Sequence, residues 1–372
     1  MLDILLTSDH LAVKELCRDL ANEVIAPSAR EAEANGAVPP AVWKAVAETG
    51  LTDAVDESLG GSGVPDTVTH MIAAENLAYG DPAIALALLW NGAVAFLLGR
   101  HGATTHRDEL NRLLSDLDAR AGLAIGEGYG RGPDELATTI EVSGDEVRIS
   151  GRKVAVPLAA TASFFLVAGV DPATRGLRLA TVPADTAGVT VSAFDGALAL
   201  DAAGLATVGF DVTVPASSLV GGAESDSASI LASIQRVRLL LAAVQLGAAQ
   251  RTIDYASKYA TERVAFGRPI AGFQGVSFPL AESQMRLAQL RVEIEEAASR
   301  LDQDDFEDHS DRVSAALAYA AEVAPEAGRT GVQTLGGHGF IKDHPVEIWY
   351  RSTAALSTVD FDPLATVFTA AL

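Results

Sequence analysis

The 372-residue sequence has a single cysteine, Cys17. One cysteine cannot form an intrachain disulfide or supply a multi-cysteine metal site, and this scarcity fits a reducing compartment. We therefore expect a cytoplasmic protein in which Cys17 is a buried, unreactive thiol. The sequence also lacks a GxGxxG after a first strand, a Walker loop and an HExxH motif. The enzyme classes with the common phosphate and zinc signatures lose support, and we expect no metal site.

Basic residues are scarce as well. Lys and Arg total 27 against 49 for Asp and Glu, so the net charge is -22. Such a surface argues against nucleic acid or an anionic membrane as the main partner. An anionic ligand must then be held by a local cluster of cations and backbone amides. The N-terminus carries acids where an export signal would carry bases, so we expect no signal peptide.

Long hydrophobic runs are limited to one, AIALALLWNGAVAFLL at residues 83–98. Asn91 and Gly92 interrupt this run near its middle, and it falls short of the roughly 20 residues that span a bilayer. The run predicts a buried core helix or a pair of helices, and no membrane partner. No repeat and no low-complexity tract is evident, so the chain is expected to fold as packed units.

Hydrophobic periodicity divides the chain into three parts. Residues 1–118 recur at helical spacing, beginning with Leu11, Val13, Leu16 and Leu20. Residues 119–225 change to short alternating runs, which are EVRIS, FFLVAGV, LRLATV and ATVGFDVTVP. This texture predicts an antiparallel sheet domain of barrel-like or sandwich form. From Ser227 onward the helical stripe returns, so residues 226–372 are expected to form a helical domain.

The first stretch that could carry chemistry is RVAFGRPIAGFQG, which begins at Arg263. Lys258, Arg263 and Arg268 cluster where we predict the end of a helix, with Gly267 and Pro269 as its stop signals. Cations are common at helix ends for electrostatic reasons alone. The functional alternative is that the arginines reach an anionic cofactor and Phe266 offers a flat apolar surface beside it.

The second stretch is QTLGGHGF, from Gln333. Gly336 and Gly337 allow the backbone to approach a ligand closely, and free amides there can receive a diphosphate, with Gln333 as a side-chain donor. A GGxG sequence is also common in ordinary turns, so the stretch alone is weak evidence.

Taken together, in this order and about 70 residues apart, the two stretches closely resemble the C-terminal signatures of the acyl-CoA dehydrogenase family. ESLGGSG near the N-terminus and GLATVGFDVTVPASSLVG from Gly204 extend the resemblance over nearly the whole chain. The resemblance implies an α+β multidomain fold. Its parts are an N-terminal helical domain (1–118), a middle β domain (119–225) and a C-terminal four-helix bundle (226–372).

The resemblance also implies a function, the FAD-dependent conversion of an acyl-CoA thioester, of a fatty acid or a steroid side chain, to the trans-2-enoyl-CoA. Members are tetramers that pass electrons to an electron-transfer flavoprotein and hold FAD across a subunit interface. The positions matching the FAD motifs are Arg263, Phe266, Gln274, Gln333, Gly336 and Gly337. Arg238 matches an arginine near the CoA and the base, and Glu127 lies in a loop that contacts flavin and substrate.

The catalytic base is where the chain first departs from the family. Counting from Arg351, Asp360 falls nearest to the family's glutamate, and Phe361 and Asp362 replace the Gly-Thr that follows it. Some members use a position just before the arginine of the CoA helix, and that position is Val237 here. Asp360 is therefore the candidate base, one methylene shorter than Glu.

The β domain departs further. In IGEGYGRGPDE, Gly126 and Gly128 replace the Thr and Pro of the family's flavin loop, and Glu127 is retained. In KVAVPLA, Ala155 and Pro157 stand where the family has Trp and a hydroxyl residue. Pro157 can offer neither a hydroxyl nor an N–H. The half of the site that serves the chain's own flavin is thus reduced, whereas the half lent to a neighbour is kept.

Three functional hypotheses follow from this pattern. In the first, the chain is an active homotetrameric dehydrogenase. In the second, it is one subunit of an α2β2 heterotetramer similar to actinobacterial enzymes that act on steroid side-chain thioesters, and it can then be a non-catalytic partner of the active subunit. The third is an Asp-based flavin oxidase or monooxygenase on the same fold.

Overall fold

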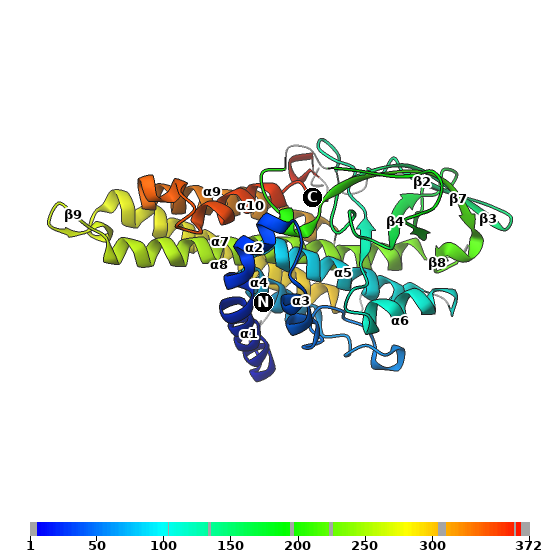
Figure 1. Cartoon of the computed structure of the whole chain (residues 1–372), viewed down its shortest axis with the longest axis horizontal. Helices are drawn as coiled ribbons and strands as arrows, with labels where there is room; N and C mark the ends of the chain where they lie inside the picture. The colour runs from blue at the N-terminus through cyan, green and yellow to red at the C-terminus, as the bar shows by residue number, and fades with distance from the viewer. Residues whose placement is uncertain are drawn as a thin grey trace, which may run out of the picture.

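The computed structural model describes residues 6–365 except 103, 133–134, 194–196, 223–225, 304–309 and 361. Figure 1 shows an elongated molecule in which a sheet occupies one end and long helices run to the other. The N-terminal helices pack beside the middle of the long ones. The expected order of helices, sheet and helices is confirmed.

Six α-helices form the N-terminal part. They are α1 (Ser8–Leu20), α2 (Ala26–Asn35), α3 (Pro40–Ala47), α4 (Thr67–Ala78), α5 (Pro82–His101) and α6 (Arg107–Ser115), with a π-helical turn, Ala21–Ile25, between α1 and α2. Helix α5 begins where Asp81 accepts hydrogen bonds from the amides of Ala83 and Ile84, a typical N-cap with proline at the first helical position.

Two helices in the described residues are long and apolar enough to span a membrane by length and composition, α5 and α7. The helix predicted from the 83–98 run was too short, because the observed helix α5 spans 20 residues. Its apolar window is 94% buried in the protein. This run is therefore a single core helix, the first of the two alternatives.

The central sheet contains eight strands: β1 (Ala121–Ala124), β2 (Thr139–Ser143), β3 (Glu146–Val156), β4 (Phe164–Val170), β5 (Leu177–Pro183), β6 (Val189–Ala193), β7 (Ala206–Pro215) and β8 (Leu219–Val220). The strand order is β6-β7-β3-β2-β4-β5-β8, with β1 beside β4, and the sheet does not close into a barrel. The wholly antiparallel prediction was wrong, because β1 and β2 both pair with β4 in parallel. The β2–β3 hairpin lies between β1 and β4 in the chain, so β4 can run in the same direction as β1.

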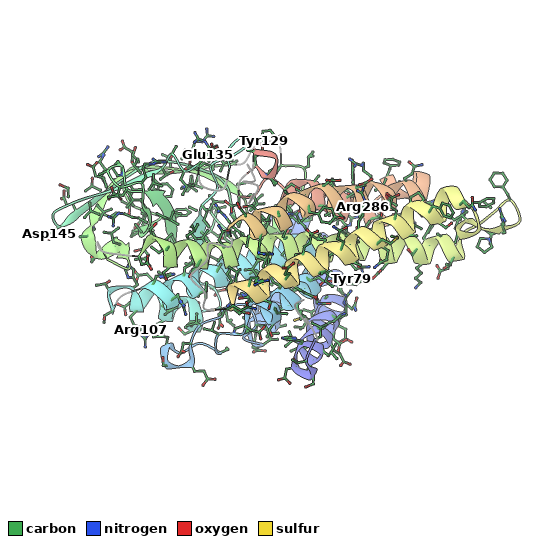
Figure 2. All side chains as sticks on the ribbon, turned by 180° about the vertical axis from the view of Figure 1, so that it is seen from behind. Tyr79, Arg107, Tyr129, Glu135, Asp145 and Arg286 are labelled. Atoms are coloured by element: carbon green, nitrogen blue, oxygen red, sulfur yellow. The ribbon has the colours of Figure 1, made fainter. Side chains whose placement is uncertain are left out.

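The C-terminal part is a helical bundle of α7 (Ser227–Glu262), α8 (Gln274–Leu301), α9 (Ser310–Leu335) and α10 (Val346–Leu356). Shorter 3₁₀ turns connect elements along the chain: Glu57–Leu59, Thr104–His106, Asp201–Ala203, Ala216–Ser218, Ile270–Gly272, η7 (Gly336–Phe340) and η8 (Pro363–Ala365). Seen from behind in Figure 2, α8 runs along the surface of the bundle, and its Arg286 pairs with Glu322 and Glu326 of α9.

The prediction that Gly267 and Pro269 end helix α7 was wrong. The helix stops at Glu262, and Gly267 and Pro269 belong to a small hairpin of β9 (Val264–Ala265) and β10 (Arg268–Pro269). Its two turn residues have positive φ, 51° at Phe266 and 81° at Gly267, as the favoured two-residue hairpin turn requires. We call residues 263–269 the arm; Figure 1 shows it at the tip of the bundle, far from the sheet.

Helix α7 is the centre of the core, since α4, α5, α8, α9 and α10 all pack against it. Cys17 is fully buried in the same apolar cluster. Burial raises the pKa of its thiol to about 12, which suppresses the reactive thiolate. The prediction of a buried, unreactive cysteine is confirmed.

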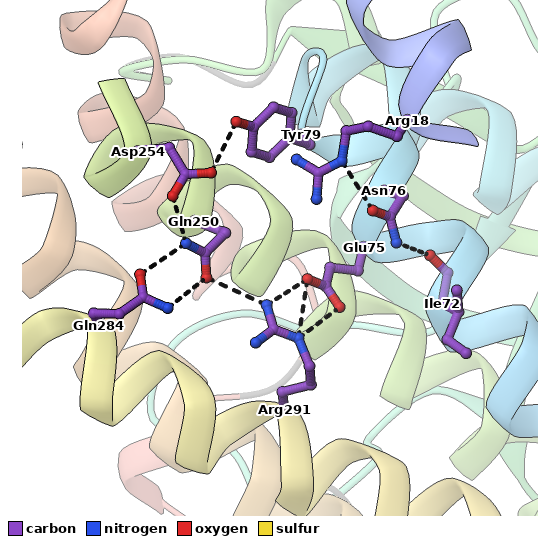
Figure 3. A network of polar contacts seen from close by, with 9 residues as sticks. All are labelled: Arg18, Ile72, Glu75, Asn76, Tyr79, Gln250, Asp254, Gln284 and Arg291. Carbon is purple, nitrogen blue, oxygen red and sulfur yellow. Dashed lines mark hydrogen bonds and ion pairs between the residues drawn. The ribbon is translucent and has the colours of Figure 1, made fainter. Parts of the chain in front are cut away.

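A polar network ties α4, α7 and α8 together (Figure 3). Arg291 of α8 donates to Glu75 of α4, with a shortest distance of 2.6 Å. The same guanidinium reaches Gln250 of α7 at 3.3 Å, and Gln250 donates to Asp254 at 2.8 Å. Tyr79 completes the set by donating to Asp254 at 2.8 Å. The helices are therefore held in register by directional contacts as well as by apolar packing.

Candidate active site

Asp360 lies just after α10 and is buried, with 3% of its surface exposed. Its carboxylate Oδ2 accepts a hydrogen bond from Nε of Arg238, on α7, at 2.6 Å. Both side chains are almost fully enclosed, so the pair is a charge-assisted contact in a dry environment. The sequence placed these two residues in the site, and the structure brings them together. Val237, at the alternative base position, is a buried residue of the same helix.

The loop at residues 126–132 packs directly on this segment. A Cβ built on Gly126 would lie 2.5 Å from the carbonyl oxygen of Asp360. The amide of Asp362 donates to the carbonyl of Arg131 at 2.9 Å, and the amide of Gly130 donates to the Asp362 carboxylate at 3.0 Å. Figure 2 shows the loop, marked by Tyr129, beside the C-terminal segment. Gly126, which replaces the family's Thr, thus lies directly against the backbone of the C-terminal segment.

A second buried ion pair lies beneath the loop. The ammonium of Lys153, on β3, donates to the carbonyl of Ile125 at 2.8 Å and to Glu127 at 2.9 Å. Glu127 also accepts from the amides of Ala137 and Thr138. These bonds anchor Glu127, and with it the loop, to Lys153 and to the segment before β2. Its role as a substrate contact stays a prediction.

Two groups close to Asp360, Lys153 and Glu127, have shifted pKa values. Burial lowers the pKa of Lys153 to about 8, although Glu127 opposes the shift. Burial acts to raise the pKa of Glu127, but Lys153 and the Thr138 hydrogen bonds outweigh it and hold that pKa below its usual range. With Arg238 and Asp360 included, the buried cluster holds two cations and two anions. This balance explains how four charges are tolerated in the interior.

Sequence reasoning missed Lys153, although a signal was present. In β3 the side chains of Val147 and Ile149 face the core, and alternation assigns Lys153 to the same face. A lysine at an inward position of a strand indicates a buried anion partner.

The end of β3 lacks the hydroxyl and aromatic groups that the family pattern would place there. Ala155 is fully buried and has a positive φ of 53°, next to an irregularity in the pairing of β3 with β7. Pro157 is buried as well and has no N–H to donate. Phe361, which replaces the glycine after the family's base, and Asp134, in the IGEGYGRGPDE stretch, lie outside the described residues.

The predicted cofactor residues lie at the other end of α7. Arg238 and Arg263 are 25 positions apart, so at 1.5 Å per residue they are about 37 Å apart along the helix axis. Phe266 is 96% exposed, and Arg263, Gln274 and Gln333 are exposed too. Arg268 stacks on Phe273 with its guanidinium carbon 4.1 Å from the ring centre, and its contact with a cofactor stays a prediction.

Three of these residues line one surface cavity of about 480 Å³, namely Arg263, Gly336 and Gly337. Gly336 has a φ of 58°, and a Cβ on either glycine would meet no atom within 4 Å. A neighbouring cavity of about 500 Å³ is lined by Gln333 and shares Thr334 with the first. Phe266 and Gln274 line neither of these two cavities. A cation beside open backbone fits the diphosphate of a dinucleotide cofactor.

In the described residues, no group of three or more His, Cys, Asp and Glu side chains could hold a metal ion. The site instead offers a buried carboxylate fixed by an arginine, next to a β domain, and a separate exposed surface for an anionic cofactor. With the three-part fold, these features fit an oxidoreductase that holds an anionic dinucleotide cofactor.

The chain belongs to the acyl-CoA dehydrogenase family. The model of the family's N-terminal domain matches residues 7–115, and the model of its C-terminal domain matches residues 228–360. The fold and the oxidoreductase class predicted from the sequence are therefore confirmed.

Relatives and solved structures agree with this assignment. The rat short/branched chain specific acyl-CoA dehydrogenase is 27% identical over 95% of this chain and 82% of its own. The CarC subunit of the caffeyl-CoA reductase-Etf complex of Acetobacterium woodii is 30% identical, over 60% of each chain. Butyryl-CoA dehydrogenase from Megasphaera elsdenii superposes with a TM-score of 0.83 at 23% identity, covering 98% of this chain and 97% of its own; this last match shows the fold alone.

Proposed function

We propose that the protein catalyses the α,β-dehydrogenation of an acyl-CoA thioester to the trans-2-enoyl-CoA. The observation that carries this proposal is the buried contact between Asp360 and Arg238 at 2.6 Å. Asp360 takes the α-proton of the thioester as the β-hydrogen leaves with its electron pair. FAD, when bound, supplies the two-electron acceptor for that hydride.

Arg238 fixes the orientation of the base. Its Nε holds one carboxylate oxygen of Asp360, and the guanidinium is itself fixed on the central helix of the core. Because Asp360 is almost fully enclosed, the proton would be transferred out of contact with bulk water. Pre-orientation of this kind can account for a large part of a rate enhancement.

The decisive experiment is flavin bleaching by an acyl-CoA under anaerobic conditions. We expect Asp360→Asn to bind the acyl-CoA but to abolish the loss of visible flavin absorbance, because the amide cannot accept the α-proton. The matched control is Asp211→Asn, a solvent-exposed carboxylate of β7 paired with Arg148, which should bleach normally. Unchanged bleaching in Asp360→Asn would exclude it as the base.

We further propose that the cofactor is shared between subunits. Arg263, where the arm begins, lies about 37 Å along α7 from Arg238, and the two glycines line a cavity together with Arg263. The same chain therefore cannot touch one flavin with both Arg238 and the arm. The arm therefore serves the FAD of a neighbour, in a homotetramer or an α2β2 heterotetramer. A reducing, cytoplasmic location and an electron-transfer flavoprotein as acceptor complete the proposal; the CarC relative is named as part of an Etf complex.

Visible absorption and native mass of the purified chain separate the remaining possibilities. One flavin per chain in a homotetramer would exclude a non-catalytic partner subunit. A colourless protein that gains flavin only with a second, homologous chain would identify it as such a partner. Oxygen consumption with bleaching by a carbon acid other than a thioester would point to the oxidase.

A further inference from the structure

Two departures from the family pattern touch each other. Gly126 stands where the family has Thr, and Asp360 stands nearest to the family's Glu. A Cβ on Gly126 would lie 2.5 Å from the Asp360 carbonyl oxygen and 2.9 Å from its Cα. Gly126 has no positive φ that would demand glycine. The glycine is therefore required by the approach of the Asp360 backbone.

The loop cannot retreat to admit a side chain. The carbonyl of Gly126 accepts from the amide of Val154 at 2.9 Å. On one side, the carbonyl of Ile125 is held by buried Lys153. On the other side, Glu127 is held by the same lysine and by two amides. Added bulk at position 126 would thus displace Asp360 and leave the loop in place.

Asp360 has little freedom on its opposite side, because its carboxylate is bonded to Arg238 on α7. To restore an ordinary contact of 3.4 Å or more, its carbonyl would have to move by about 1 Å from the 2.5 Å position. A shift of about 1 Å in a reacting group can cost roughly 10²-fold in rate.

We propose that Gly126 is a positioning residue for the Asp360 carboxylate, and that the small residue at 126 and the short acid at 360 are one linked change. This proposal rests on the proposed function, because it assigns Asp360 as the base. The absence of a side chain at 126 fixes the backbone of Asp360 where its shorter side chain meets Arg238.

The first test is Gly126→Ala in the flavin-loaded protein. We expect kcat for acyl-CoA oxidation to fall about 10²-fold with little change in KM, because the base moves and the binding surface does not. Gly176→Ala is the matched control. It adds the same methyl group to a β-domain turn, where the nearest atoms are side-chain atoms, the Thr174 hydroxyl at 3.3 Å and Ser227 at 3.8 Å. Wild-type kcat in Gly126→Ala would overturn the proposal.

A double-mutant cycle tests the link between the two positions. Gly126→Thr and Asp360→Glu should each lower kcat strongly. The double variant restores the family's pairing of the two residues, and we expect its kcat to exceed the value calculated from the two single losses by at least tenfold. Additive losses would show that the two residues act independently and would overturn the link.

Hydrogen exchange gives a readout that does not depend on activity. Displacement of Asp360 should break the bond from the Asp362 amide to the carbonyl of Arg131, so Gly126→Ala should speed exchange of that amide by tenfold or more. Gly176→Ala should not. If the wild-type protein oxidised no acyl-CoA and Gly126→Ala still exchanged faster, the positioning would be supported and the proposed function rejected. Unchanged exchange would overturn the positioning, whatever the activity.

Discussion

His70 is an unusual residue of the helical core. It lies on α4 and is buried, and neither ring nitrogen has a hydrogen-bond partner among the described residues. Burial, with the nearby charge of Arg236, lowers its pKa from 6.5 to about 3. The imidazole therefore stays neutral in the folded protein at pH values where the unfolded chain is already charged.

We expect this histidine to make the protein acid-sensitive. Between pH 6.5 and pH 3 the unfolded state binds a proton that the folded state does not, so stability falls as the pH falls. His70→Leu should remove a slope of roughly 1.4 kcal/mol per pH unit from the free energy of unfolding, measured by urea denaturation at pH 6.5, 5.5 and 4.5. Exposed His338, replaced by Asn, is the control. Equal slopes in wild type and His70→Leu would contradict the assignment.

At the residue scale, sequence patterns located the groups but not their contacts. Asp360 and Arg238 were placed by counting from motif residues, and they meet in the structure. The close approach of Gly126 to Asp360 could not be predicted, because it depends on packing between segments far apart in the chain. Lys153 was overlooked since lysines are rarely buried without a specific partner.

The contacts between helices lead to a prediction about α8. Arg291→Met would leave the largely buried Glu75 without its guanidinium partner, and Glu75 would have to be desolvated alone. We expect a loss of about 2 kcal/mol in unfolding free energy, measured by chemical denaturation. Arg286→Met is the control on the same helix, because its glutamate partners are on the surface; it should cost no more than about 1 kcal/mol.

A double variant separates the energy of the Glu75–Arg291 contact from the effects of losing each side chain alone. Glu75→Leu combined with Arg291→Met removes both charges, so we expect the double variant to lose less stability than the two single losses added together. Strict additivity would mean that the contact between these side chains contributes little and that their apolar stems account for the effect.

At the element scale, the four runs predicted as strands all lie in strands, although FFLVAGV is apolar and buried throughout. EVRIS, FFLVAGV, LRLATV and ATVGFDVTVP lie in β3, β4, β5 and β7. The strand β1, with the sequence AGLA, was missed because a short run of small residues has no alternation. The end of α7 was misplaced because Gly267 and Pro269 are equally suited to a helix stop and to a hairpin turn.

At the scale of the whole molecule, apolar side chains are exposed along α8. Phe278, Met285 and Val292 are spaced seven residues apart, and each is more than half exposed. A stripe at this spacing is typical of a helix that packs against another helix. Exposed apolar side chains on one face of a helix are candidates for an interface, and the proposed assembly would cover them.

We expect Met285→Glu, in the middle of this stripe, to lower the native mass measured by light scattering. A charge would have to be buried in the interface, so a tetramer should dissociate to smaller species while the far-ultraviolet circular dichroism is kept. Leu11→Glu is the control, because Leu11 is comparably exposed but lies on α1. A native mass that is the same for Met285→Glu and wild type would place the interface elsewhere.

The order of the three parts could be inferred from hydrophobic periodicity, but the distance between the two functional ends could not, because it depends on one uninterrupted helix, α7. That rigid helix carries the arginine of the base at one end and the arm at the other. If the arm serves a neighbour, as proposed, a chain that has lost its base still lends its arm to another chain, and a chain without a working arm still has its base. In genetic terms, two alleles, one defective in the base and one in the arm, would complement each other. After a gene duplication, one copy could then lose the residues at either site, and its product would still complete the site of the other copy's product.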